Sequence, residues 1–406
     1  MKSLWSSPTL RSVVIYGASG LGFAGANLIL ARSLPPNEYG RFTLVIALIN
    51  LSFALAPIGI DGLVLRRHLE VAPALLKRTL GAGLIIGTIS LLIAGLAYNL
   101  STIYLLLVFA ATVGGGAMAV AGAKFQSEQR YAISLALTQS PNMVLIVAAL
   151  AVMVSNVRQA ELPLVIASFG FVGAGVLGWW ILFQERERNE DQGAGFPWYE
   201  AVSFAGMNAA GLLLIQLDRL IIPHVLPLHD LATFGVLAAI AGSLFRVLSM
   251  GIGYTLVPRL RAASTVMERR RLIGHEAKLV GMIVVSGSLV IWFLTPLIEG
   301  WFLAGKYHLG GALVMATLFS GVAKILNSFT KSTVTALATG TEILIVNVLG
   351  WLSVAVAIAA GASGARWGLA GVIYGVGLGW LTRAISAAFL TLRHLRLPAT
   401  AAVPAQ

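Results

Sequence analysis

Residues 34–67 read LPPNEYGRFTLVIALINLSFALAPIGIDGLVLRR, and residues 226–259 repeat the pattern as LPLHDLATFGVLAAIAGSLFRVLSMGIGYTLVPR. At this offset of 192 residues, eight of the 34 positions are identical without a gap. Shared apolar composition alone would give roughly three or four identities. Each copy holds an apolar run close to the length of about 20 residues that a helix needs to cross a bilayer. The chain is therefore predicted to contain an internal repeat of membrane-spanning helices.

The composition of the whole chain indicates an integral membrane protein. Of its 406 residues, 58% are hydrophobic and only 11% are charged, and the mean hydropathy is +0.87. Soluble proteins carry about 25% charged residues, so soluble enzymes and nucleic-acid-binding modules are excluded. The net charge of +12 suits cytoplasmic loops beside anionic membrane lipids and gives no reason to expect nucleic acid as a partner. The absence of cysteine excludes disulfides, thiol catalysis and thiolate metal sites.

Twelve candidate membrane spans follow one another with short loops between them. They lie near residues 12–32, 42–63, 81–98, 103–123, 132–154, 163–183, 201–223, 232–256, 279–296, 310–330, 342–361 and 369–391. The longest polar stretches are 64–80, 184–200 and 257–278. No folded domain is expected outside the membrane.

The repeat predicts how the spans are arranged. Its offset covers six helices, and because six is even, both halves have the same orientation in the membrane. The predicted fold is an all-α integral membrane protein with about 12 transmembrane helices, in two parallel-repeat six-helix lobes around a central cavity. Residues 1–183 form the N-terminal lobe, 184–200 the cytoplasmic linker, and 201–406 the C-terminal lobe with a short tail. The linker QERERNEDQGAGFPWYE has the mixed charge and the glycines of a solvated connector.

Basic residues predict the orientation. Alternating the loops places nineteen of the 28 Lys and Arg residues on the side of the N-terminus and five on the other side, and four lie inside spans. Basic residues are enriched in cytoplasmic loops, so both termini are expected in the cytoplasm. The first apolar run is too long for a cleavable signal peptide, and none is expected.

One motif suggests a cofactor and is rejected. Gly20, Gly22 and Gly25 complete a GxGxxG pattern, which binds dinucleotides only at a strand–turn–helix junction. Here the pattern lies in the middle of an apolar span, where small residues allow close helix packing. The chain has no Walker A loop and no HExxH pattern, so no catalytic residues, metal or bound cofactor are predicted, and the protein is not expected to be an enzyme. Without a nucleotide-hydrolysing motif, a proton or sodium gradient is one energy source that stays open.

Charged side chains inside the spans are the main candidates for a functional site. Arg219, Arg246, Lys324 and Arg383 all belong to the second lobe, where Asp218 is the one acid clearly within a span. A charge at the centre of a membrane helix costs roughly 2.5–3.5 kcal/mol on insertion scales, so it indicates function by default. Cations that share a cavity suit an anionic substrate, because a guanidinium binds phosphate oxygens in pairs. The alternative is that helix carbonyls or local partners satisfy each cation.

Neutral polar residues complete the candidate set. Asn27 occupies the repeat position that matches Arg219, and Asn50 lies within the second span. The predicted substrate-binding residues are therefore Arg246, Lys324, Arg219, Asp218, Asn27 and Asn50. Pro57 and Pro141 are expected to mark kinks. Three tryptophans have the character of interface-belt residues, namely Trp179, Trp180 and Trp301.

Several short stretches resemble bacterial polysaccharide-export flippases. ILARSLPPNEYGRFTLVIALINL at 29–51, followed by IGIDGLVLRR at 58–67, is similar to the opening of these proteins. LLIQLDRLIIPHVLPLHDLATFGVLAAI at 213–240 resembles their seventh and eighth helices. The tripeptide 305–307 and ALATGTEILIVN at 336–347 resemble later signatures of the family. The family shares a superfamily with multidrug-and-toxin extruders and with the peptidoglycan-precursor flippase.

The resemblance implies a function. It implies a transporter of the bacterial inner membrane that moves an undecaprenyl-diphosphate-linked oligosaccharide to the outer leaflet by alternating access, for lipopolysaccharide or exopolysaccharide biosynthesis. Basic cavity residues would bind the diphosphate, a role that falls on Arg246 first, then on Lys324 and Arg219. The implied partners are the lipid-linked substrate, membrane lipids, and polysaccharide polymerase and export proteins. The sequence departs from the family in having no basic residue deep in its first lobe.

Two other functions stay open. A cation-coupled multidrug extruder of the same superfamily is disfavoured because such pumps, by resemblance, often use an acid in the first helix or its neighbours, and the first helix of this chain has none. A membrane-embedded glycan polymerase or transferase would be expected to carry catalytic carboxylates in a large loop, which the chain also lacks.

Overall fold

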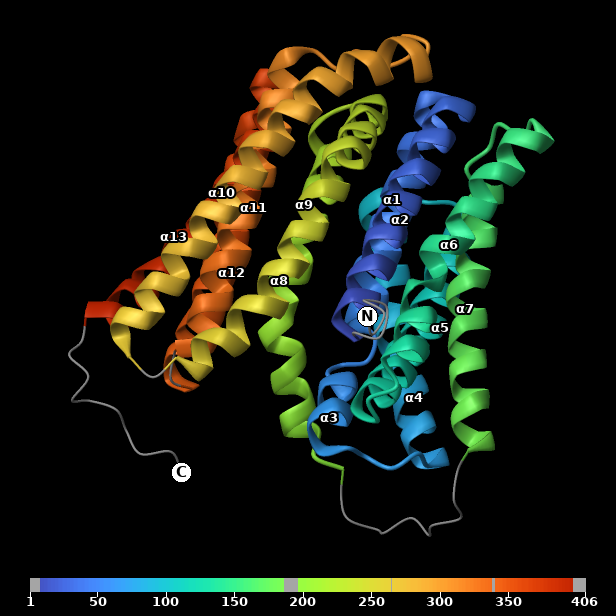
Figure 1. Ribbon diagram of the computed structural model, residues 1–406. Helices are drawn as coiled ribbons and strands as arrows, with labels where there is room; N and C mark the ends of the chain where they lie inside the picture. Colours follow the sequence, from blue (N-terminus) through green and yellow to red (C-terminus); the bar gives the residue numbers. More distant parts are fainter. Residues whose placement is uncertain (1–7, 186–195, 264, 338–339, 397–406) are drawn as a thin grey trace, which may run out of the picture. The chain divides into compact units, whose positions relative to one another are not determined.

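The computed structural model describes residues 8–185, 196–263, 265–337 and 340–396, and all regular structure in these ranges is helical (Figure 1). Of the thirteen α-helices, α3 has 8 residues and the other twelve have 20 or more. The helices are α1 (Pro8–Ser33), α2 (Pro36–Leu55), α3 (Ile60–Arg67), α4 (Pro73–Tyr98), α5 (Thr102–Ser127), α6 (Tyr131–Ser155), α7 (Glu161–Gln184), α8 (Trp198–Val225), α9 (Leu228–Ala262), α10 (Val266–Leu297), α11 (Gly311–Leu337), α12 (Gly340–Gly364) and α13 (Gly368–Arg396), with short π and 3-10 turns at η2 (Ile298–Phe302) and η3 (Ala365–Trp367).

The long helices correspond to the twelve predicted spans. Within the described residues, nine segments are long and apolar enough to cross a membrane, and one of them, 344–393, contains both α12 and α13. These segments account for ten of the twelve long helices. Some side chains of the other two, α1 and α9, lie outside the described part of the chain. The protein is thus a multi-pass membrane protein.

The chain divides into two compact units, residues 1–236 and residues 237–406. The division falls inside α9. The predicted linker 184–200 joins α7 to α8, and its residues 186–195 lie outside the described part. The lobes predicted at 1–183 and 201–406 stay a prediction.

One apolar core cluster of unit 1 lies among α3, α4, α5, α6 and α7. Ile60 of α3, Phe125 of α5 and Trp179 of α7 belong to one buried apolar cluster. Trp179 is only 4% exposed, and its indole N–H donates to the carbonyl oxygen of Ala117 over 3.0 Å. The prediction that Trp179 belongs to the interface belt is therefore wrong, because its side chain faces the core. Consecutive residues of a helix point about 100° apart, so two neighbouring tryptophans can face different surroundings. Its neighbour Trp180 is 56% exposed.

The second predicted span, 42–63, is not one continuous helix. α2 ends at Leu55, and α3 begins at Ile60 after a turn in which Gly59 has a φ of 78°. Pro57 cannot donate a helical hydrogen bond, and the turn brings α3 against α8. A Cβ on Gly59 would lie 1.9 Å from the carbonyl oxygen of Ala201. The predicted kink is a break with a change of direction, whereas α6 continues as a helix through Pro141.

The rejected GxGxxG pattern lies in continuous helix, as expected. α1 runs without interruption from Pro8 to Ser33. A Cβ on Gly22 would meet the side chain of Ile146 at 2.8 Å, so this glycine allows α1 to approach α6 closely. Ser19 on the same helix donates to Gln139 over 2.7 Å, and Asn142 donates to Ser19 over 2.9 Å.

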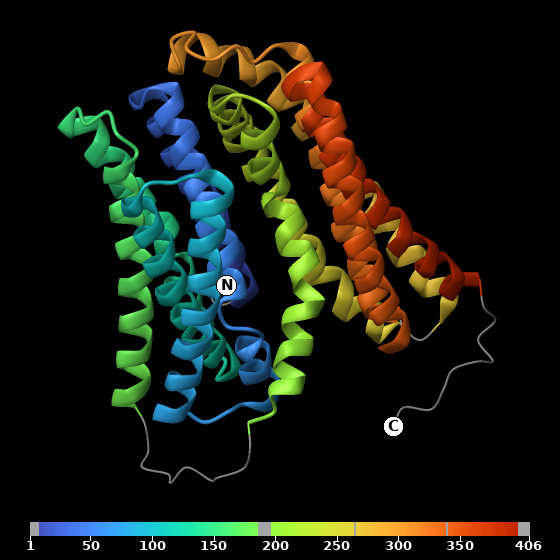
Figure 2. The same ribbon diagram turned by 180° about the vertical axis from the view of Figure 1, so that it is seen from behind.

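In unit 2, the orange-to-red helices α11, α12 and α13 lie side by side in both views (Figure 2). α12 and α13 meet through small residues spaced four apart. A Cβ added to Gly371 would lie 2.1 Å from the carbonyl oxygen of Gly364. One added to Gly375 would lie 2.3 Å from the carbonyl oxygen of Ala360, and one added to Gly379 would lie 2.4 Å from the Cβ of Ala357. Glycine at these positions allows backbone-to-backbone packing in lipid.

Two helices begin earlier than their predicted spans because their first turns are polar. α4 begins at Pro73, a residue favoured at the first helical position. α10 begins after Thr265, whose side-chain oxygen accepts the N–H of Glu268 over 3.1 Å. Much of the stretches 64–80 and 257–278 is therefore helical.

Candidate functional site

Three of the six predicted site residues gather in unit 1 around a tyrosine. Tyr39 of α2 is fully buried, and its hydroxyl donates to the Oδ1 atom of Asn27 on α1 over 3.4 Å. Asn27 is 7% exposed and its amide donates to the carbonyl oxygen of Phe23 over 2.8 Å. The phenol of Tyr39 thus links α1 and α2 by a polar contact inside the membrane-spanning region.

α8 contributes the charged part of this site. Arg219 donates through Nη1 to Oε1 of Gln216 over 2.8 Å, and it lies within electrostatic range of both Asp218 and Tyr39. Asp218 is 1% exposed and Gln216 is 5% exposed. We call Asn27, Tyr39, Gln216, Asp218 and Arg219 the Tyr39 cluster. It places an arginine, an aspartate and three neutral hydrogen-bonding groups together.

Close helix packing holds the Tyr39 cluster in place. A Cβ on Gly40 would lie 2.4 Å from the carbonyl oxygen of Leu228, and a Cβ on Gly235 would lie 3.1 Å from the ring of Tyr39. Both glycines therefore let α2 approach the first turns of α9. The hydroxyl of Thr43 donates to the carbonyl oxygen of Tyr39 over 2.8 Å.

Sequence reasoning missed Tyr39 and Gln216. Asn27 and Arg219 occupy equivalent repeat positions, which could have prompted a search for a group between them. Gln216 precedes Arg219 by three residues, the spacing of neighbours on one helix face. Tyr39 left no comparable signal, because Leu231 occupies its repeat position.

The other three predicted residues lie elsewhere. Asn50 is half-buried on α2, eleven residues and about 16 Å along the helix axis from Tyr39, and none of the side-chain hydrogen bonds of the described residues involves it. Lys324 belongs to α11 in unit 2, where its Nζ atom lies 5.9 Å from the ring centroid of Trp380. Arg246 lies in α9, but its side chain is outside the described residues.

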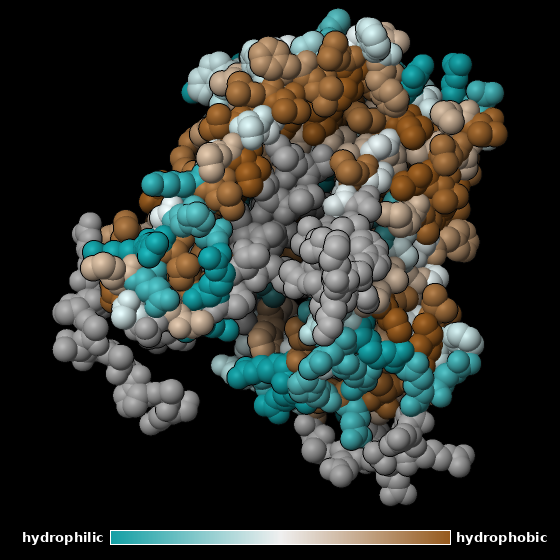
Figure 3. Space-filling model, viewed as in Figure 1, coloured by the Kyte–Doolittle hydropathy of each residue, from teal (hydrophilic) through white to brown (hydrophobic). Residues whose placement is uncertain are grey.

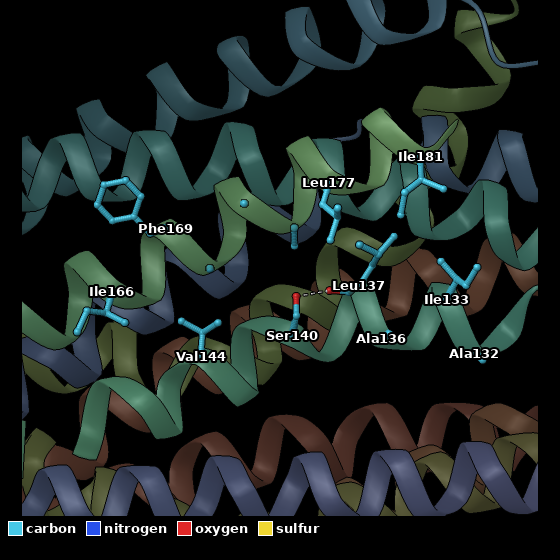
Figure 4. Close-up of a pocket in the computed structure, with 13 residues that line it drawn as sticks. Ala132, Ile133, Ala136, Leu137, Ser140, Val144, Ile166, Phe169, Leu177 and Ile181 are labelled. Carbon is cyan, nitrogen blue, oxygen red and sulfur yellow. Dashed lines mark hydrogen bonds between the residues drawn. The ribbon is translucent and has the colours of Figure 1, made fainter. Parts of the chain in front are cut away.

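A separate groove in unit 1 has a different chemistry. It has a volume of about 660 Å³ and lies between α6 and α7, with a lining that is almost entirely carbon. Figure 4 shows Leu137, Val144, Phe169 and Leu177 around it, and the hydroxyl of Ser140 is engaged with the Leu137 carbonyl oxygen over 2.7 Å. The groove offers nothing to a charged head group and suits a hydrocarbon chain.

Basic residues gather at one end of unit 1. Glu200 at the start of α8 accepts from Arg66 at 3.2 Å and from Arg67 at 2.6 Å, which ties α3 to α8. Figure 3 shows hydrophilic residues over α3 and the start of α4, whereas the surface along α6 and α7 is mostly hydrophobic. Both arginines are more than half exposed, so each pair contributes at most about 1 kcal/mol.

A second ion pair at this end joins α6 to α7. Arg130 donates through Nη2 to Oε1 of Glu185 over 3.0 Å and makes a further contact through Nη1. This hydrogen bond lowers the pKa of Glu185 and raises the pKa of Arg130. Among the residues that the structure describes, no three His, Asp or Glu side chains are arranged to hold a metal ion.

Comparison with known proteins identifies the fold. Neither the protein-family models nor the curated proteins give a sequence match. An inward-facing multidrug resistance MATE family transporter of the MOP superfamily superposes with a TM-score of 0.63 at 13% identity, over 94% of this chain and 98% of that chain. Lipid II flippase MurJ in its inward closed conformation gives 0.65 at 9% identity, over 93% and 86%. A MATE in the bent conformation gives 0.52 at 14% identity, over 94% and 93%.

These likenesses concern the fold. The chain has the fold of the MATE and MurJ structures, and the predicted all-α membrane fold of about twelve helices in two lobes is confirmed.

Proposed function

We propose that this protein is a transporter of the bacterial inner membrane that flips an undecaprenyl-diphosphate-linked oligosaccharide to the outer leaflet for surface polysaccharide biosynthesis. The observation that carries the proposal is the burial of cationic groups within apolar helices. Arg219 lies in the Tyr39 cluster, and Arg383 is only 3% exposed on α13. Such groups are costly in a membrane unless they serve a ligand or a local partner.

The proposed substrate matches the chemistry of these residues. A diphosphate offers several oxygen acceptors to guanidinium and ammonium donors. The oligosaccharide suits neutral donors and acceptors such as Asn27, Tyr39 and Gln216. The prenyl chain stays in lipid, and the apolar groove between α6 and α7 gives it a surface on unit 1.

Alternating access is the proposed mechanism. The cavity opens to the cytoplasm, takes up the glycan and diphosphate, and then opens to the other side. A ligand can drive this change only through a difference in its affinity for the two states. Arg246, Lys324, Arg219, Asp218, Asn27 and Asn50 are the residues proposed to contact the substrate. A proton or sodium gradient is the proposed energy source. The proposed orientation has both termini in the cytoplasm. Polysaccharide polymerase and export proteins are the proposed partners.

A likeness to a solved flippase supports this proposal. One structural neighbour is by name a lipid II flippase, which acts on a lipid-linked molecule. Two others are named as MATE transporters, one of them for multidrug resistance. They favour a cation-coupled multidrug extruder as a second candidate, for which the buried carboxyl group of Asp218 supplies an acid.

The test uses a deletion strain complemented with wild type, Arg246→Ala, Arg219→Gln or Arg41→Gln. Arg41 is an exposed residue at the start of α2 and serves as the matched control. We expect undecaprenyl-linked oligosaccharide to accumulate in the deletion strain and surface polysaccharide to disappear. Wild type and Arg41→Gln should restore both, and the other two variants should restore neither at equal membrane levels. Unchanged lipid-linked glycan combined with increased sensitivity to cationic drugs would favour the extruder.

A further inference from the structure

A second polar site lies in unit 2, between α11 and α13. Ser320, Lys324, Asn327 and Lys331 follow one another at intervals of four, three and four residues, which places them on one face of α11. Trp380 and Arg383 share a face of α13 by the same rule. We call these six residues the α11–α13 seam.

Two contacts establish that the two faces meet, and a third shows that the helices stay together further along. A Cβ on Gly377 would lie 3.4 Å from the Cα of Ser320. The Nζ atom of Lys324 lies 5.9 Å from the Trp380 ring, and the hydroxyls of Thr333 and Thr391 are 3.0 Å apart.

These contacts also fix the register of the two helices. The paired residues are 57, 56 and 58 positions apart in the chain. The helices therefore run parallel with a constant offset. At that offset Asn327 lies level with residue 384, so Asn327 and Arg383 lie at nearly the same depth along the two helices.

The seam contains buried polar atoms that lack hydrogen-bond partners. The Ser320 hydroxyl, the Asn327 Oδ1 atom and the Trp380 indole N–H are all buried without a partner. Arg383, only 3% exposed, makes no hydrogen bond or ion pair with another described residue. A single unsatisfied buried group costs about 1–3 kcal/mol. Three such atoms beside a buried cation point to a ligand.

The charge of the seam determines the kind of ligand. Lys324, Lys331 and Arg383 are cationic, and Lys331 lies within electrostatic range of Arg383. Neither α11 nor α13 contains Asp or Glu, and the neighbouring α12 has one acid, Glu342, in its first turn. A metal cation would add to the positive charge. Water could satisfy hydrogen bonds but would not offset the charge.

We propose that the α11–α13 seam binds a phosphate-class oxyanion, with the Arg383 guanidinium and the Trp380 indole N–H as its central donors. The Ser320 hydroxyl completes the set of unpaired donors, the unpaired Oδ1 atom of Asn327 can accept from a protonated oxygen of the anion, and Lys324 and Lys331 supply further charge. The lipid diphosphate of the proposed substrate and a free inorganic anion are two sources of the same chemistry. The identity of the lipid rests on the proposed function, whereas the anion site rests on the seam.

The variants are chosen to separate the site from the fold. Trp380→Phe keeps the aromatic ring and removes the N–H, and Arg383→Lys keeps the charge while Arg383→Gln removes it. Arg366→Gln is the matched control, because Arg366 is an arginine of unit 2 outside the seam, and its guanidinium lies 3.9 Å from the ring centroid of Trp367. The full chain is placed in lipid nanodiscs, and the affinities for undecaprenyl diphosphate and for inorganic pyrophosphate are measured.

We expect wild type and Arg366→Gln to bind undecaprenyl diphosphate equally. Arg383→Gln should weaken binding at least about tenfold, which corresponds to about 1.4 kcal/mol, and Trp380→Phe by severalfold. Arg383→Lys should bind with an affinity between those of wild type and Arg383→Gln. Parallel weakening of pyrophosphate binding would show that the seam also takes a free anion. If pyrophosphate does not bind, the lipid is the source.

Wild-type affinity in both Arg383→Gln and Trp380→Phe would overturn the proposal, and Trp380→Phe decides if Arg383→Gln does not fold. A flipping assay on the same samples separates the two proposals. Loss of binding in the variants without flipping by wild type would leave the anion site and refute the flippase. Normal flipping by wild type with unaltered binding in the variants would support the flippase and refute the anion site.

Discussion

Replacing Gly59 by alanine tests the turn that directs α3 against α8. Gly59 has a φ of 78°, and a left-handed backbone costs a residue with a Cβ roughly 1–2 kcal/mol. The new Cβ would also lie 1.9 Å from the Ala201 carbonyl oxygen and 2.8 Å from its carbon, both backbone atoms of α8. Relieving such overpacking costs about 1–3 kcal/mol. We therefore expect Gly59→Ala to destabilise unit 1 by about 2–5 kcal/mol.

The assay is thermal unfolding of the detergent-solubilised protein, followed by the fraction that stays monodisperse after heating. Gly206→Ala is the control, because Gly206 lies in α8, the helix that Gly59 approaches, and nothing is within 4 Å of its added Cβ. That variant should match wild type or gain up to about 1 kcal/mol from better helix propensity. Gly59→Ala should unfold at a temperature at least about 5 °C lower. Equal unfolding temperatures for the two variants would refute the close approach of α3 to α8.

Three further outcomes are expected. Trp179→Phe should lose about 1 kcal/mol, because the carbonyl oxygen of Ala117 loses a buried donor, whereas Trp180→Phe should leave the unfolding temperature unchanged; equal losses would contradict the burial of Trp179. Tyr39→Phe should reduce surface polysaccharide at an unchanged protein level if the phenol orients the Tyr39 cluster, and normal polysaccharide would contradict that role. The folded-state pKa of Glu185 is lowered, so its ion pair with Arg130 contributes fully above the ordinary pKa of a glutamate and is lost as the pH falls through the lowered value. Wild type should therefore lose more thermal stability than Glu185→Gln in acid, and identical pH profiles would contradict the pairing.

The sequence predicted the number of long helices, because apolar runs of about 20 residues have one common explanation in a membrane protein. It did not predict how they end. The break at Pro57 and Gly59 depends on the approach of α8, which lies about 140 residues further along the chain. The early start of α10 could have been predicted, because Thr265 and Glu268 form a helix-capping pattern.

The candidate site was predicted in part for a similar reason. Rarity of charge in apolar spans identified Asp218, Arg219 and Lys324. It could not identify Tyr39 or Trp380, since aromatic residues are common in membrane helices and become polar partners only through contacts made in the fold. The repeat related Asn27 to Arg219 but did not indicate that they belong to one cluster. Arg383 was recognised as a cation within a span, and its depth relative to Asn327 depends on the register of α11 and α13.

The glycines that join α12 to α13 have a consequence for how the protein is made. Gly364 and Gly371 contact each other across seven residues of chain, so this interface needs no partner that is far away in sequence. Contacts of this kind close quickly and at low entropic cost. α12 and α13 follow each other in the chain and leave the ribosome after α11, so they can pair with each other as they enter the membrane. The finished hairpin of α12 and α13 then docks onto α11 as one unit, which completes the α11–α13 seam in a single step.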